Sequence, residues 1–240
     1  MVGLSIVDTR PQTRANGSNK LETRDRPIHD WYRFVLSFPP HLVRESLGRF
    51  QLGENSLLLD PFCGTGTTLV EAKICGVPSV GIEANDLAYF ASSVKVNWNI
   101  DPEDLLASAE KIAKVANDQI GNHDASMLAT LPGEAAEILL ADSISPLPLH
   151  KSLLLIRAID EHRETQAYSH LRLAFAKALV FSCSNLHFGP EVGVDRIKKQ
   201  DAPVVEAWLR EVSAMAADLR RSQNAGVCSK VIHADSRQIG

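Results

Sequence analysis

One short stretch of the chain combines an acidic residue with two closely spaced glycines, a pattern that suits the binding of a small charged molecule. Residues 60–68 read Asp-Pro-Phe-Cys-Gly-Thr-Gly-Thr-Thr and follow the apolar run Ser56–Leu59. Glycine lets the backbone approach a ligand closely, and a helix that follows would direct the positive end of its dipole towards that ligand. Taken alone, a Gly-x-Gly pattern is often only a tight turn between a strand and a helix, so the neighbouring residues decide.

These neighbouring residues argue against two common phosphate sites. No lysine follows Gly66, as the Gly-Lys-Ser/Thr signature of nucleoside triphosphate sites requires. Leu69 stands where dinucleotide-binding turns have a third glycine, and the charge of Asp60 would repel a pyrophosphate. A cationic ligand without phosphates, such as S-adenosylmethionine, fits better. Asp60 could hold its methionyl ammonium, directly or through water, and the amides of the turn could hold its carboxylate.

Two further acids, Glu83 and Asp235, are expected at the same edge of a sheet. The apolar runs Ser79–Ile82 and Lys230–Ala234 are typical of parallel strands and end at these acids, as the first strand ends at Asp60. Ligands of open α/β sheets bind outside the carboxyl ends of the strands. Glu83 matches the acid that binds ribose hydroxyls in NAD or S-adenosylmethionine, and Asp235 could accept from an adenine amino group. Each acid alone is at least as well explained as a helix cap or surface residue, but the three together favour binding.

The patterning around these segments predicts an α/β fold. The order strand, helix, strand, helix around the turn is a βαβ unit that opens a doubly wound sheet. Asp86 is a candidate N-cap, and residues 129–150 are typical of a loop. Helices are expected at Trp31–Phe38, His41–Phe50, Thr67–Cys75, Asp86–Trp98, Glu103–Ile120, Lys151–His162, Gln166–Leu186 and Pro203–Arg221.

Composition and motifs exclude several classes of protein. The net charge of −4 does not indicate a strongly basic nucleic-acid binder, although a local basic stripe can lie within a neutral total. The four cysteines show no CxxC spacing, so neither a metal site nor a redox motif is indicated. We find no apolar run long enough to span a membrane and no signal peptide, and we expect a cytoplasmic protein. The motifs of serine hydrolases and zinc proteases are absent, and the scattered histidines are best explained as surface or core residues.

Four segments resemble the DNA amino-methyltransferases, which methylate adenine N6 or cytosine N4. Residues 60–68 with Glu71-Ala72 look like the cofactor motif, and residues 34–43 are similar to a second cofactor segment whose helix packs over the methionine end. Gly81–Glu83 resembles the ribose-binding motif and Ala234–Ser236 the adenine-binding motif. The resemblance implies S-adenosylmethionine as cofactor and a partial Rossmann-like class I methyltransferase fold. The cofactor-binding residues that it implies are Phe38, Pro39, Asp60, Pro61, Phe62, Gly64, Thr65, Gly66, Thr68, Glu83 and Asp235.

The catalytic motif of this family is not found in the 240 residues. It reads Asn/Asp/Ser-Pro-Pro-Tyr/Phe, holds the target amino group and stacks its ring on a base flipped out of the duplex. The one Pro-Pro pair, Pro39-Pro40, follows Phe38 and precedes the glycine turn, so no catalytic residue is assigned. We therefore expect a cofactor-binding portion truncated before this motif, inactive alone, with an unpaired apolar edge on its first strand. DNA is the expected partner of the complete enzyme, and a complementing polypeptide could carry the catalytic half.

Two alternatives stay open beside this reading. An RNA guanine-N2 methyltransferase has a similar cofactor turn, but the first 27 residues are too short and polar for the N-terminal RNA-binding domain that it normally carries. The chain could also be a non-catalytic or split subunit of a methyltransferase. A dehydrogenase comes last, because Asp60 and Leu69 argue against a dinucleotide.

Four segments are expected along the chain. Residues 1–27 form a disordered polar arm, 28–100 the cofactor-binding βαβ half, 101–228 a helical insertion between the second and third strands, and 229–240 the third strand. Basic residues of the insertion could contact phosphates, but charged outer faces of helices are the better explanation for most of them. These residues are Arg157, Arg163, Arg172, Lys198, Lys199, Arg220 and Arg221.

Overall fold

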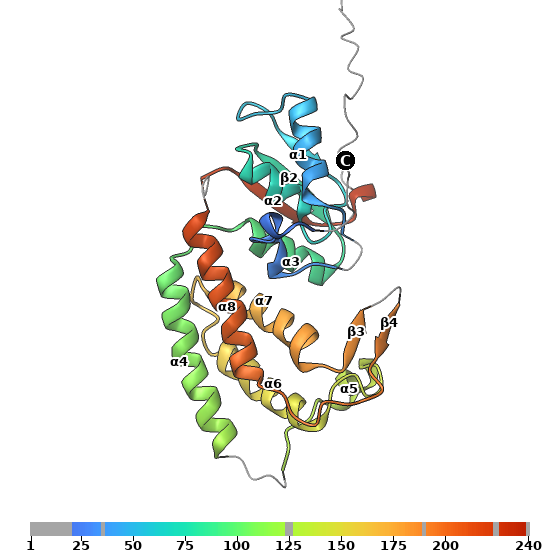
Figure 1. Ribbon diagram of the computed structural model, residues 1–240, viewed down its shortest axis with the longest axis vertical. Coiled ribbons are helices and arrows are strands. Elements are labelled where there is room, and N and C mark those ends of the chain that lie inside the picture. Colours follow the sequence, from blue (N-terminus) through green and yellow to red (C-terminus); the bar gives the residue numbers. More distant parts are fainter. Residues whose placement is uncertain (1–20, 35–36, 123–126, 189–190, 223–225, 239–240) are drawn as a thin grey trace, which may run out of the picture.

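Three parallel strands form the small sheet that carries the glycine turn. β1 (Leu58–Asp60) pairs with β2 (Ser79–Glu83), and β2 pairs with β5 (Ser229–His233). The register sets Asp60 opposite Gly81 and Glu83 opposite His233, so the carboxyl ends of the strands meet at one edge. The computed structural model describes residues 21–34, 37–122, 127–188, 191–222 and 226–238, and the sheet lies in the upper part of Figure 1.

Helices α1, α2 and α3 lie beside the sheet (Figure 1). α1 (Pro40–Arg49) begins with a proline, whose missing N–H is not needed at this position, and α2 (Thr67–Ile74) ends just before Gly76 at a φ of 76°. α3 (Asp86–Val96) is capped by Asn85, whose side-chain oxygen accepts from the amide of Ala88 at 3.0 Å. The cap predicted at Asp86 is therefore one residue too late, because Asn85 is the last residue with extended backbone.

Beyond α3, the chain up to β5 is mainly helical and forms the lower part of Figure 1. α8 packs against α4, α6 and α7, and the two-stranded antiparallel hairpin β3–β4 lies to the side. The elements of this region are α4 (Pro102–Gly121), α5 (Gly133–Ile138), α6 (Pro146–Asp160), α7 (Tyr168–Ala178), a π-helix (Leu179–Cys183), β3 (Leu186–Phe188), β4 (Val192–Val194) and α8 (Val204–Arg221).

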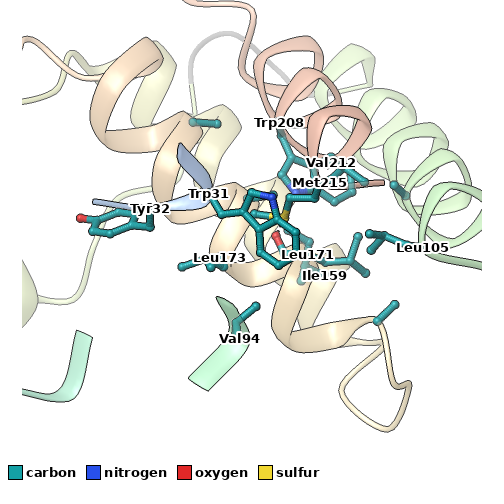
Figure 2. Close-up of a cluster of buried hydrophobic side chains, with 14 of the residues drawn as sticks. Trp31, Tyr32, Val94, Leu105, Ile159, Leu171, Leu173, Trp208, Val212 and Met215 are labelled. Carbon is teal, nitrogen blue, oxygen red and sulfur yellow. The ribbon is translucent and has the colours of Figure 1, made fainter. Parts of the chain in front are cut away.

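One hydrophobic core joins the sheet and the helical region (Figure 2). Leu69 and Val94 enter it from α2 and α3, and Leu105, Leu171 and Trp208 from the helical region. The indole N–H of Trp208 donates to the carbonyl of Leu171 at 3.0 Å, so this buried donor has an acceptor. The helical region is therefore built into the same core as the sheet.

The predicted α/β fold, a parallel sheet interrupted by a helical region, is confirmed. Two differences fall within residues 129–150, which were predicted to be a loop. α5 lies inside this stretch, and α6 begins at Pro146, five residues before the predicted start at Lys151. The prolines in this stretch led to the prediction of a loop. The first turn of a helix nevertheless tolerates proline, because its N–H groups have no partner in the helix.

The helix predicted over Gln166–Leu186 is wrong in its last third. The α-helix ends at Ala178, a π-helix follows, and the chain then enters β3. Ser184 closes the π-helix, since its amide donates to Leu179 O at 2.9 Å and its hydroxyl to Val180 O at 2.6 Å. A short apolar run fits a helix or a strand equally by periodicity.

The helix predicted over Trp31–Phe38 is absent from the described part of that stretch. A 3₁₀ helix covers His29–Trp31, and Tyr32 is extended with a φ of −163°. Trp31 is 2% exposed, and its indole N–H donates to Oδ2 of Asp218 in α8 at 2.9 Å. The spacing of the aromatic residues thus reflects burial against distant elements and not a helical face.

Residues 1–20 of the predicted polar arm lie outside the described residues. Its last part is packed: Thr23–Asp25 form a 3₁₀ helix, and the buried Asp25 accepts from Arg44 at 2.8 Å. The described fold therefore includes residues before the predicted boundary at residue 28, because Arg44 pairs with the buried Asp25. The division into four domains stays a prediction.

Candidate functional site

The glycine turn between β1 and α2 adopts backbone angles that require glycine. Gly64 has a φ of 53° and Gly66 a φ of 85°, a region that residues with a Cβ rarely adopt. A Cβ at Gly66 would also lie 3.0 Å from the Cβ of Ser92 on α3. The first amides of a helix have no partner within it, so the N-terminus of α2 offers donors beside the turn.

Two of the predicted acids, Asp60 and Glu83, accept hydrogen bonds from amides of the turn. Oδ1 of Asp60 accepts from the amide of Phe62 at 3.0 Å. Glu83, at the end of β2, accepts from the amide of Gly64 through Oε2 and from that of Asn85 through Oε1, both at 2.8 Å. A carboxylate oxygen has more than one lone-pair site, so both acids can hold the loop and still accept from a ligand.

Asp235 stands apart from the other two acids. It follows the end of β5 by two residues, and both of its oxygens accept from Arg237, the shortest contact being 2.6 Å. These hydrogen bonds to Arg237 lower the pKa of Asp235. Beside it, His233 stacks on Tyr89 with ring centroids 4.6 Å apart. Any ligand that bonds to Asp235 shares this carboxylate with Arg237 or displaces the guanidinium.

A cavity of about 560 Å³ opens beside the turn. Its size is in the range of small-molecule sites. The turn contributes part of the lining, Phe38 contributes another part from just before α1, and the rest comes from two distant segments. The lining residues are Tyr32, Arg33, Phe34, Ser37, Phe38, Phe62, Cys63, Gly64, Thr65, Thr67, Phe181, Phe188 and Val192.

The cavity brings together only some of the residues predicted to bind the cofactor. Phe38, Phe62, Gly64 and Thr65 line it, and Thr68 lines a neighbouring hollow together with Phe38. Outside its lining are Pro39, Asp60, Pro61, Gly66, Glu83 and Asp235, of which Asp60 and Glu83 bond to lining backbone. Sequence reasoning missed the contribution of Phe181, Phe188 and Val192, which no local motif marks.

Gly81 in β2 leaves the space that the side chains of Cys63 and Leu69 occupy beside the strand. A Cβ at this position would lie 2.7 Å from Sγ of Cys63 and 2.8 Å from Cδ2 of Leu69. Gly81→Ala is therefore expected to lower the free energy of unfolding by about 2 kcal/mol through overpacking, measured by urea denaturation. The matched control is Gly53→Ala, since no atom lies within 4 Å of a Cβ there. Equal stability of both variants would show that the turn can shift freely.

A buried network of charged side chains, not foreseen from the sequence, lies behind the turn. Glu71 of α2 is 1% exposed and accepts from Nε2 of His29 at 2.7 Å and from Arg44 at 2.8 Å. Arg44 of α1 also donates to Asp25 at 2.8 Å. Burial lowers the pKa of His29, so its ring is neutral and donates to Glu71. The network ties α1, and with it the preceding Phe38, to the helix that follows the turn.

Cys63 lies in the turn but is no reactive nucleophile. Burial raises the pKa of its thiol to about 12, so the reactive thiolate is scarce near neutral pH. Among the described residues, no group of three or more His, Cys, Asp or Glu side chains could hold a metal ion. Within the same residues, we find no helix with the length and apolar character that crossing a membrane needs.

Several basic residues of the helical region make contacts within the chain. Nζ of Lys199 donates to the carbonyls of Ser182 and Ser184 at 3.0 and 2.6 Å. Arg220 forms an ion pair with Glu103 at 2.6 Å. For Lys199 and Arg220, an intramolecular role thus accounts for the charge without a phosphate.

Comparison with known proteins extends these observations. A family model described as DNA methylase matches residues 10–92. The chain is 29% identical over 226 residues to the Type II methyltransferase M.BsoBI of Geobacillus stearothermophilus, covering 88% of the chain and 44% of that protein. It is 34% identical over 74 residues to the Type II methyltransferase M.MjaII of Methanocaldococcus jannaschii, covering 30% of the chain and 14% of the relative.

A third relative acts on RNA by its name. The tRNA (guanine(10)-N2)-dimethyltransferase of Methanocaldococcus jannaschii is 36% identical over 73 residues, which cover 28% of the chain and 21% of that protein. No solved structure matches the chain. The chain spans less than half of the length of each of these three curated relatives.

The matches and the site point in the same direction. The family model covers α1, β1, the glycine turn, α2 and β2, which hold most of the residues singled out above. The match to M.BsoBI continues through the helical region. Together, the family model and the match to M.BsoBI support the DNA amino-methyltransferase family, which the chain resembles in the glycine turn and the elements around it.

Proposed function

We propose that this chain provides the S-adenosylmethionine site of a DNA methyltransferase that methylates the exocyclic amino group of adenine or cytosine. The observation that carries the proposal is the glycine turn, with Asp60 before it and the carboxylate of Glu83 bonded to the amide of Gly64 at 2.8 Å. When bound, the cofactor supplies the electrophilic methyl group. The chain's own residues bind and orient it.

The charged groups at the turn match the charges of this cofactor. Asp60 attracts the methionyl ammonium, the amides at the start of α2 receive the carboxylate, and Glu83 accepts from the ribose hydroxyls. Asp235 accepts from the adenine amino group and shares its carboxylate between this group and Arg237. The remaining predicted contacts, from Phe38, Pro39, Pro61, Phe62, Gly64, Thr65, Gly66 and Thr68, pack around the methionine end.

The catalytic motif would reach this site along the exposed edge of β1. β1 is an edge strand of the described sheet, and the side chains of Leu57 and Leu59 are 69% and 60% exposed. An apolar edge strand readily pairs with a further strand. We propose that a segment with the Pro-Pro-Tyr/Phe motif, in a longer chain or in a complementing polypeptide, pairs here.

DNA is favoured over RNA as the substrate by the extent of the similarities. The match to M.BsoBI covers 88% of the chain and includes the helical region, whereas the match to the tRNA dimethyltransferase covers 28%. A cofactor-binding segment shared by both kinds of enzyme explains the shorter match. A non-catalytic or split subunit would keep the same cofactor site and differ in where the catalytic motif resides.

Asp60→Asn tests the cofactor assignment. Asparagine keeps an oxygen that can accept from the amide of Phe62, so the turn is preserved while the charge is lost. The dissociation constant for S-adenosylmethionine, measured by isothermal titration calorimetry, should rise about 10-fold or more, because a hydrogen bond to a charged group contributes about 1.5–3 kcal/mol.

The control is Asp104→Asn, which removes the charge of an exposed acid on α4. Its affinity for S-adenosylmethionine should equal that of the wild type. Binding of NAD in place of S-adenosylmethionine by the wild-type chain would contradict the proposal, as would an unchanged dissociation constant in Asp60→Asn.

A further inference from the structure

The cavity at the glycine turn has an aromatic wall, and two of its rings come from outside the family motifs. Phe181 belongs to the π-helix and Phe188 to β3, and their ring centroids lie 5.0 Å apart. The ring of Phe181 also meets Tyr32 edge-on at 6.1 Å, and Tyr32 meets Phe34 in the same way at 6.1 Å. A continuous row of four rings thus joins the N-terminal segment to the helical region.

The rings of this wall remain open to a ligand. Phe34 is 42% exposed and Phe181 44%, although both line the cavity and contact the buried Tyr32. Val192 of β4, 58% exposed, extends the same surface. Apolar side chains that stay exposed around a cavity mark a binding surface more often than unused surface.

The backbone that carries Phe181 is fixed in an unusual conformation. π-helical turns are rare and concentrate at functional sites. Here Lys199 holds the turn from the segment before α8, by donating to Ser182 O and Ser184 O. The side chain of Asn185, 1% exposed, donates to Asp142 O at 3.0 Å and to Ser145 Oγ at 3.1 Å. These bonds place Phe181 reproducibly at the cavity.

Two cations stand beside the aromatic wall. A smaller hollow of about 300 Å³ adjoins the cavity and shares Arg33, Phe34 and Phe181 with it. Lys177 lines this hollow as well and forms an ion pair with Glu211 at 2.7 Å, and Asp30 is the acid among the lining residues. Rings next to a guanidinium and an ammonium suit a nucleotide, whose base stacks while its phosphate meets the cations.

We propose that Phe181 and Phe188 form the stacking wall for the base that accepts the methyl group, with Arg33 and Lys177 placed for the adjoining phosphate. The helical region between β2 and β5 is then part of the acceptor site of the enzyme. This inference rests on the proposed function, because the base is taken to come from DNA and to meet the cofactor bound at the turn.

A base fits this wall better than the cofactor does. The methionine end of S-adenosylmethionine is a flexible zwitterion, and its charges are matched by Asp60 and the amides of α2. It gains little from the rings of Phe181 and Phe188. A nucleobase has two flat faces, and stacking on aromatic side chains is sequence-tolerant and contributes about 1–3 kcal/mol per base.

The experiment compares ring-removing and ring-keeping variants of the 240-residue chain. Phe181→Leu and Phe188→Leu should each raise the dissociation constant for a short fluorescein-labelled single-stranded DNA about 5-fold or more, measured by anisotropy with saturating S-adenosylmethionine. Phe181→Tyr keeps the ring and should bind like the wild type. Phe50→Leu removes a 68% exposed ring at the end of α1, outside the cavity, and serves as the control.

Calorimetry of the same variants separates the two levels of the proposal. An unchanged affinity for S-adenosylmethionine in Phe181→Leu and Phe188→Leu, with weaker DNA binding, supports the stacking wall. Weaker cofactor binding in these variants, or DNA binding equal to wild type, overturns it and leaves the cofactor site standing. A wild-type chain that binds no S-adenosylmethionine overturns both. Unchanged thermal midpoints show that the variants fold.

Discussion

Glu71→Leu is expected to lower the free energy of unfolding by about 3 kcal/mol, measured by urea denaturation. The carboxylate is 1% exposed and accepts from two donors, His29 and Arg44. Removing one member of a buried charged pair leaves its partner without compensation, which costs about 3–5 kcal/mol. We take the lower value because the side chain of Arg44 is 31% exposed and keeps Asp25. The thermal midpoint should fall by about 6 to 12 °C.

Glu110→Leu is the matched control for this prediction. Glu110 is exposed on α4, and a surface substitution of this kind is expected to change stability by less than about 0.5 kcal/mol. A loss below about 1 kcal/mol in Glu71→Leu would contradict the idea that the network is closed to water. The leucine fills the same space, so a cavity does not explain the loss.

The segment around the turn could be predicted closely because its signals are local. β1, α2 and β2 lie within one or two residues of their expected ranges. Gly66 needs a left-handed backbone, and Gly76 ends α2 in the same way. These requirements involve neighbours in the chain, so the residue types alone express them.

The wall of the cavity could not be predicted, because it depends on contacts between distant parts of the chain. Phe181 had the apolar spacing of a core helix, and nothing near it shows that it meets Tyr32. His29 and Glu71 are 42 positions apart, and each has the appearance of a surface residue in its own segment. The two side chains meet in the buried part of the fold, and no sequence pattern indicates that they pair.

Through the shared core, the helical region packs against residues next to the cavity. Trp31 packs among Leu171, Trp208 and Met215 (Figure 2), and Tyr32 next to it lines the cavity. A change in the packing of α7 or α8 is thereby passed to the residues that precede Phe38. This arrangement makes the inserted helices a structural part of the cavity at the glycine turn.

Lys95→Met is expected to flatten the pH dependence of stability above neutral pH. The Lys95 side chain is fully buried on α3, where Nζ donates to the carbonyl of Tyr32 at 3.1 Å. The pKa of Lys95 is lowered from 10.5 to about 7, mainly by burial; Arg33 and Lys177 contribute in the same direction, and Asp30 opposes them. Between pH 7 and 10.5 the unfolded chain binds a proton that the folded chain does not. The wild type should therefore gain stability with rising pH.

The measurement is the free energy of unfolding of the wild type minus that of Lys95→Met, from pH 7 to 10. This difference should increase by up to about 1.4 kcal/mol per pH unit, the slope for one proton. Below pH 7 both states of the wild type hold the proton, so the difference should level off, with the variant the more stable protein. Lys111→Met, at an exposed position of α4, should follow the wild type throughout. A constant difference across this range would mean that Lys95 stays charged, and the carbonyl of Tyr32 would then bond an ammonium behind the aromatic wall.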